Sequence, residues 1–169
     1  MRRILDCLYD GAAALAALCM VGLLIAVLTS IASRQLGVNV PGIDSYAGYL
    51  MAASGFLALA STLKRGEHIR VTLILGHLKG AAHRRLELAA LFIALLLSLL
   101  FAWYSVRLVW QSYDFHDIST NNDATPLWLP QLSMAIGAVI FAIAFIDEFA
   151  LELAGKRRQR DDGELLRTE

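Results

Sequence analysis

Charged residues are scarce in this sequence. Only 18% of the 169 residues are Asp, Glu, Lys or Arg and 57% are apolar, whereas an ordinary soluble domain carries about a quarter charged residues. Cysteine is also rare, and Cys7 and Cys19 cannot supply a disulfide scaffold or a four-ligand zinc site. The apolar excess excludes a disordered chain, because disordered segments have too little apolar surface to bury. The scarcity of charge therefore argues against both a soluble domain and a disordered one.

Four long blocks of the sequence contain no Asp, Glu, Lys, Arg or His. They cover residues 11–33, 45–63, 88–106 and 124–146. About 20 helical residues cross the hydrocarbon core of a bilayer, and the alternating pattern of a membrane β-barrel is absent. The first block is too long for the core of a signal peptide, which has about 7 to 15 residues. The sequence therefore predicts an all-α integral membrane protein with four transmembrane helices.

The distribution of Lys and Arg predicts the orientation. The N-terminus, the connection between the second and third blocks and the C-terminal tail carry 13 of the 15 basic residues, and the other side has only Arg34 and Arg107. Because basic segments favour the cytoplasm, we expect both termini there. Residues 1–155 would form one membrane domain, and residues 156–169 a charged cytoplasmic tail. The zero net charge then averages a basic inner surface and an acidic outer one.

The connection between the second and third blocks has the pattern of an amphipathic helix at about residues 66–85. Its apolar face holds Val71, Ile74, Leu75 and Leu78. The basic residues expected to contact lipid headgroups are Arg70, Lys79, Arg84 and Arg85. We expect this helix to lie in the membrane interface. A water-exposed helical hairpin is the alternative, because the pattern does not identify what its apolar face contacts.

The longer outer connection, residues 107–123, is acidic and polar. Three of its carboxylates are candidates for docking a soluble partner, namely Asp114, Asp117 and Asp123. The alternative is that these charges are only solvated.

Motifs for chemistry are missing. The blocks contain no histidine for haem ligation and no ionisable group for proton coupling. A glycine-rich phosphate loop, zinc-ligand spacing and a serine-centred elbow are also absent. We therefore expect no catalytic, cofactor or metal site, and no enzyme.

Four short features occur in order along the chain. Arg34 follows the first block, and Asp44 opens the second. Next comes Gly66-Glu67-His68-Ile69-Arg70-Val71, and Pro126, Trp128 and Pro130 lead into the last helix. This series, over about residues 12–146, resembles the DctQ-like small membrane subunit of tripartite ATP-independent periplasmic (TRAP) transporters. The third feature is similar to that family's Gly-x-His-Ile-x-Val segment, although Thr72 stands where the family commonly has Asp.

The resemblance implies an accessory scaffold subunit in the bacterial inner membrane. Its partners would be a large membrane subunit, which carries the substrate and sodium sites, and a periplasmic binding protein that delivers a carboxylate-type solute. Two alternatives stay open. One is a self-contained homo-oligomeric transporter or channel, whose polar path would need hydroxyls such as Thr29, Ser54, Ser61, Ser98 and Ser105. The other is a membrane anchor for an enzyme complex.

Overall fold

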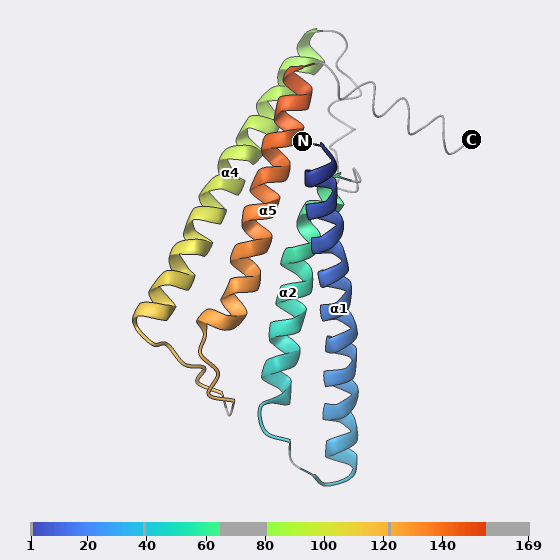
Figure 1. Ribbon diagram of the computed structural model, residues 1–169, viewed down its shortest axis with the longest axis vertical. Helices are drawn as coiled ribbons and strands as arrows, with labels where there is room; N and C mark the ends of the chain where they lie inside the picture. The colour runs from blue at the N-terminus through green and yellow to red at the C-terminus, as the bar shows by residue number, and fades with distance from the viewer. Residues whose placement is uncertain (1, 39, 65–80, 122, 155–169) are drawn as a thin grey trace, which may run out of the picture.

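Four helices make up the described part of the chain (Figure 1). The computed structural model describes residues 2–38, 40–64, 81–121 and 123–154. The helices are α1 (Arg2–Gln35), α2 (Ile43–Lys64), α4 (Ala81–Asp114) and α5 (Trp128–Leu153). Each contains a segment long and apolar enough to cross a membrane. The predicted all-α fold with four spans is therefore confirmed.

The helices do not end where the uncharged blocks end. α1 begins at Arg2, and α4 continues to Asp114 through part of the predicted outer connection. α5 begins at Trp128, four residues after the start of the uncharged block, and runs on to Leu153. The backbone at Ala124 has a φ of 46°, and Pro126 forms a bridge with Ile118. These features place residues 124–127 in a turn before the helix.

The predicted interfacial helix falls mostly outside the described residues. The structure shows only its last part, which belongs to α4 because that helix begins at Ala81. Arg84 and Arg85 are therefore exposed residues near the start of a transmembrane helix.

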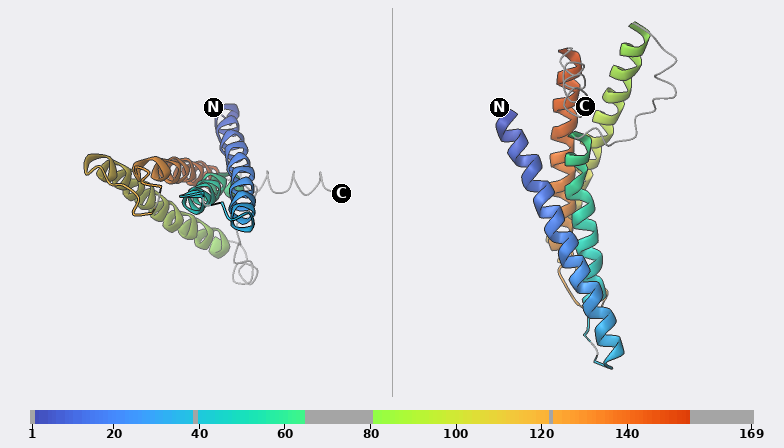
Figure 2. Two further views of the ribbon diagram at one scale, coloured as in Figure 1. Left: turned by 90° about the horizontal axis from the view of Figure 1, so that it is seen from below. Right: turned by 90° about the vertical axis from the view of Figure 1, so that its right-hand side faces the viewer.

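α2 and α5 form the centre of the bundle. α1 packs on α2, α4 packs on α5, and α1 contacts α5 only slightly. Figure 2 shows α1 and α4 on opposite sides of this central pair. One core cluster joins three helices, with Tyr9 and Ala12 from α1, Ala60 from α2, and Ile140 and Ala144 from α5.

Small side chains allow the helices to approach one another closely. A Cβ atom added at Gly137 of α5 would lie 2.5 Å from the carbonyl oxygen of Phe56 in α2. α4 buries Ser98, Ala102 and Ser105, and Ala102 packs with Ala138 and Ala142 of α5. Close approach through small residues is a common packing mode of membrane helices. By contrast, the outer faces of α1 and α4 expose large apolar residues such as Leu18, Leu24, Leu97 and Trp103.

The two short connections lie at the same end of the bundle (Figure 1). They join α1 to α2 and α4 to α5. The start of α1 and the end of α5 lie at the opposite end. This arrangement follows from four antiparallel spans, and it gives the bundle two separate polar ends.

Candidate functional site

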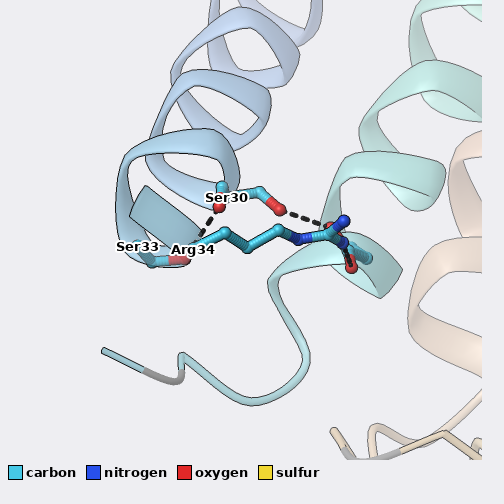
Figure 3. Close-up of polar contacts among 4 residues, drawn as sticks. Ser30, Ser33 and Arg34 are labelled. Carbon is cyan, nitrogen blue, oxygen red and sulfur yellow. Dashed lines mark hydrogen bonds and ion pairs between the residues drawn. The ribbon is translucent and has the colours of Figure 1, made fainter. Parts of the chain in front are cut away.

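An ion pair joins the end of α1 to the start of α2. Arg34 donates a hydrogen bond from Nη2 to Oδ2 of Asp44 over 2.8 Å. Ser30 donates from Oγ to the other carboxylate oxygen over 2.7 Å, and Ser33 donates to the carbonyl oxygen of Ser30 over 2.8 Å. Figure 3 shows the Arg34 side chain reaching from α1 towards the first turn of α2. Two positions of the family resemblance therefore contact each other.

This ion pair borders a small polar cavity of about 300 Å³. Ser30, Ser33, Arg34 and Asp44 supply its polar wall, and the rest is lined by Gly37, Val38, Val40 and Ile43. The side chains of Arg34 and Asp44 are 72% and 67% exposed. The two charges are thus fixed relative to each other but stay open to the surroundings.

Asp123 fastens the longer outer connection to α2. Tyr49 donates a hydrogen bond from Oη to Oδ2 of Asp123 over 3.0 Å, and Ser119 donates from Oγ to Oδ1 over 2.8 Å. Hydrogen bonds, first from Thr125 and then from Ser119 and Tyr49, lower the pKa of Asp123 to about 2. Gly42, with a φ of 81°, packs directly against Asp123. Asp123 therefore connects both outer connections with α2.

The other two docking candidates are arranged differently. Asp114 ends α4, Asp117 lies in the connection itself, and both residues are exposed. The connection between them and α5 is closed by two backbone hydrogen bonds. Ser119 N–H donates to the Thr125 carbonyl oxygen over 2.8 Å, and Leu127 N–H donates to the Asp117 carbonyl oxygen over 2.9 Å. Asp123 thus forms hydrogen bonds within the protein, whereas Asp114 and Asp117 are exposed at the surface.

The proline- and tryptophan-containing positions shape the entry into α5. Trp128 contacts Tyr113 edge-on, with ring centroids 5.7 Å apart, and so joins α4 to α5. Pro130 lies in the first turn of α5, where a missing N–H removes no hydrogen bond of the helix. Together with the bridge at Pro126, these contacts explain locally why the chain turns here.

A second polar cluster lies at the other end of the bundle. Lys64 donates a hydrogen bond from Nζ to Oδ1 of Asp6 over 2.6 Å, and its Nζ lies 5.4 Å from the centroid of the Tyr9 ring. Tyr9 is buried, and no described group forms a hydrogen bond with its hydroxyl. At the same end, Arg84 donates to the carbonyl oxygen of Leu153 over 3.5 Å. Sequence reasoning missed this cluster, because the spacing of Asp6 and Tyr9 marks a shared helix face but not the helix that contacts it.

Several predicted site residues lie outside the described part of the chain. They are the family positions Gly66, His68, Ile69 and Val71 and the lipid-contact candidates Arg70, Ile74, Leu75, Leu78 and Lys79. Within the described ranges, no three His, Cys, Asp or Glu residues gather where they could hold a metal ion.

Four of the five hydroxyls considered for a polar path donate to carbonyl oxygens of their own helices. Thr29 donates to the carbonyl oxygen of Ile25, Ser54 to that of Met51 and Ser61 to that of Ala58. Ser98 donates in the same way to Leu95, and Ser105 is buried. In helices, Ser and Thr hydroxyls commonly donate in this way to the carbonyl oxygen three or four residues earlier.

Comparison with known proteins places the chain in a family. No curated protein matches the sequence. The sequence does match the family described as "Tripartite ATP-independent periplasmic transporters, DctQ component" over residues 23–155. The match runs from within α1 to the end of α5 and includes the Arg34–Asp44 pair and the Asp123 contacts. The resemblance seen in the sequence is confirmed: the chain belongs to the DctQ component family, the small membrane subunits of TRAP transporters.

Proposed function

We propose that this chain is an accessory scaffold subunit of a sodium-coupled TRAP transporter. It supports the large membrane subunit and docks a periplasmic substrate-binding protein for uptake of a carboxylate-type solute. Family membership supports the partners. The observation that supports the scaffold role is that the hydroxyls of Thr29, Ser54, Ser61 and Ser98 donate to carbonyl oxygens of their own helices.

The orientation proposed from the sequence has both termini in the cytoplasm of a bacterial cell. The Arg34–Asp44 pair and the Asp123 contacts then lie on the periplasmic side, and the Lys64–Asp6 pair on the cytoplasmic side. Residues 1–155 form the membrane domain, and residues 156–169 form a cytoplasmic tail. The excess of Lys and Arg in the inner segments supports this orientation.

Docking of the binding protein is assigned to the exposed carboxylates Asp114 and Asp117. Asp123 holds the outer connection against α2, so Asp117 lies on an anchored loop and Asp114 at the end of α4 beside it. Reversing the charge of both exposed residues, with Asp114→Lys and Asp117→Lys, should weaken uptake at limiting binding protein. Unchanged uptake would remove them as docking residues.

Residues 66–85 are proposed to include a helix in the cytoplasmic membrane interface. Leu75→Asp or Leu78→Asp places a charge on the apolar face at a cost of roughly a few kcal/mol, so each should lower the yield of the assembled complex. Thr72→Asp, on the polar face, is the matched control. Normal yield from both leucine variants would argue for a surface exposed to water.

Reconstitution into proteoliposomes tests the scaffold role. The chain alone should show no sodium-driven uptake, whereas uptake should appear when the large subunit and the binding protein are added. Robust uptake by the chain alone would support a self-contained transporter instead. Co-purification with a soluble redox enzyme, in place of a large membrane partner, would support a membrane anchor.

A further inference from the structure

The Arg34–Asp44 ion pair lies at the edge of the hydrocarbon layer. Arg34 directly follows the uncharged block that ends at Ser33, and Asp44 directly precedes the block that begins at Ser45. In a bilayer, the ends of such blocks lie at the level where acyl chains give way to headgroups. The exposed guanidinium and carboxylate therefore face lipid headgroups and water rather than hydrocarbon.

Both charged groups keep unused hydrogen-bonding capacity. Among the described residues, the Arg34 guanidinium donates only to Asp44, so most of its N–H groups are available. Asp44 accepts one hydrogen bond at each oxygen, from Ser30 and Arg34, and each oxygen has a second lone pair. The site can therefore bind a ligand that brings both an anion for Arg34 and a cation with N–H donors for Asp44.

On the hydrocarbon side of the pair, the face of α1 that carries Arg34 is apolar. Val27 and Ile31 lie within two helical turns before Arg34, and both are exposed. A wholly soluble ligand would make no contact with this apolar surface. A headgroup attached to acyl chains would cover it.

We propose that Arg34 and Asp44 form a binding site for the headgroup of a zwitterionic phospholipid with a primary ammonium group. The lipid phosphate contacts Arg34, the ammonium donates to Asp44, and the start of the acyl chains contacts Ile31 and Val27 of α1. Ser30 holds the carboxylate in place for this contact. The site is independent of the proposed docking and scaffold roles.

Charge complementarity selects this lipid class. An anionic headgroup such as phosphatidylglycerol brings a phosphate to Arg34 but no cation to Asp44, so the carboxylate repels it. The quaternary ammonium of phosphatidylcholine has no N–H group and cannot donate to Asp44. Phosphatidylethanolamine satisfies both members of the pair.

Native mass spectrometry of the full chain, purified in its membrane complex, tests the proposal. The probes are phosphatidylethanolamine, phosphatidylcholine and phosphatidylglycerol with identical acyl chains. We expect phosphatidylethanolamine to bind about ten-fold or more tightly than the other two, which is the factor that one hydrogen bond to a charged group provides. Equal binding of phosphatidylethanolamine and phosphatidylcholine would overturn the proposal.

Matched variants locate the effect. Asp44→Asn keeps the acceptor for Ser30 but removes the charge, so the preference for phosphatidylethanolamine over phosphatidylglycerol should disappear. Asp44→Glu should retain it, and Arg34→Gln should weaken binding of all three lipids. Arg107→Gln and Asp114→Asn remove exposed charges away from the cavity and should change nothing. An unchanged preference in Asp44→Asn, or an equal loss in the two controls, would contradict the site.

A soluble competitor distinguishes a lipid site from a site for a free phosphate compound. Glycerophosphoethanolamine carries the same phosphate and ammonium but no acyl chain. We expect it to leave phosphatidylethanolamine bound, because it has no acyl chain to cover the apolar face of α1. Binding as tight as that of the lipid would overturn the assignment to a membrane ligand.

Discussion

Gly42 and Asp123 bring the two outer connections into contact. The backbone of Gly42 has a φ of 81°, a conformation that residues with a Cβ atom rarely adopt. A Cβ atom at this position would lie 2.8 Å from Cβ of Asp123. Backbone strain and crowding therefore act together at one residue.

Replacing Gly42 tests this contact. We expect Gly42→Ala to lower the free energy of unfolding by about 1 kcal/mol or more, because alanine is strained at positive φ. Gly48→Ala is the matched control, since a Cβ atom there meets no heavy atom within 4 Å. Thermal unfolding of the detergent-solubilised chain measures the difference. Equal melting temperatures for the two variants would show that the contact contributes nothing.

The lowered pKa of Asp123 predicts how acid affects the outer connection. A carboxylate with a pKa near 2, below its ordinary 3.8, stabilises the folded connection when it is ionised. This contribution is fully present above pH 4 and is lost as the pH falls towards 2. Asp123→Asn should remove the acid dependence and leave the connection looser at neutral pH, because the amide offers only one acceptor oxygen.

Hydrogen-exchange mass spectrometry of residues 115–127 measures this effect. After correction for intrinsic exchange rates, protection of the wild-type connection should fall between about pH 4 and pH 2. Asp114→Asn, which changes an exposed carboxylate at the end of α4, should behave like the wild type. The same loss of protection in Asp123→Asn, or no loss in the wild type, would refute the role of Asp123.

At the scale of the helices, the crossing of α2 and α5 depends on one glycine. The carbonyl oxygen of Phe56 occupies the space beside Gly137, so a methyl group there can be accommodated only if the helix backbones move apart. We expect Gly137→Ala to destabilise the bundle by about 1–3 kcal/mol, the usual cost of overpacking. Gly55→Ala provides the control, because its Cβ atom would meet no heavy atom within 4 Å. Circular dichroism during thermal unfolding should separate the variants; equal stability would show that the crossing relaxes without cost.

The existence of the helices could be predicted from the sequence, but their ends could not. The length of an uncharged block indicates how much of the chain lies in the hydrocarbon. A helix can extend beyond that block, because its backbone hydrogen bonds can continue into the interface and the water. α5 therefore extends past Ile146 and buries Glu148 and Glu152. Its start at Trp128 depends on the conformation of Ala124, which no periodicity reports.

The site was predictable only in part for a related reason. Arg34 and Asp44 flank a short connection, so their contact follows from local geometry. The hydrogen bond from Tyr49 to Asp123 and the bond from Lys64 to Asp6 join distant segments. Their pairing depends on which helices are neighbours, and hydrophobicity alone does not specify that order.

At the scale of the whole molecule, the polar contacts between helices lie in two groups, one at each end of the bundle. One end has Asp123 and the Arg34–Asp44 pair, and the other has the Lys64–Asp6 pair beside Tyr9. α1 and α4, at the edges, expose broad apolar faces between these ends. Lipid or a neighbouring protein must cover those faces, because their exposure to water would be costly.

The proposed orientation can be tested with single cysteines at the two ends. Cys7 and Cys19 are first replaced by serine and alanine, and Thr120→Cys and Ala154→Cys are introduced separately, since both positions are exposed in the structure. If basic segments stay in the cytoplasm, a membrane-impermeant maleimide applied to spheroplasts should label position 120 at once. Position 154 should react only after the inner membrane is permeabilised. The reverse pattern would place Arg34, Asp44 and Asp123 in the cytoplasm, where a periplasmic binding protein could not reach the outer connection.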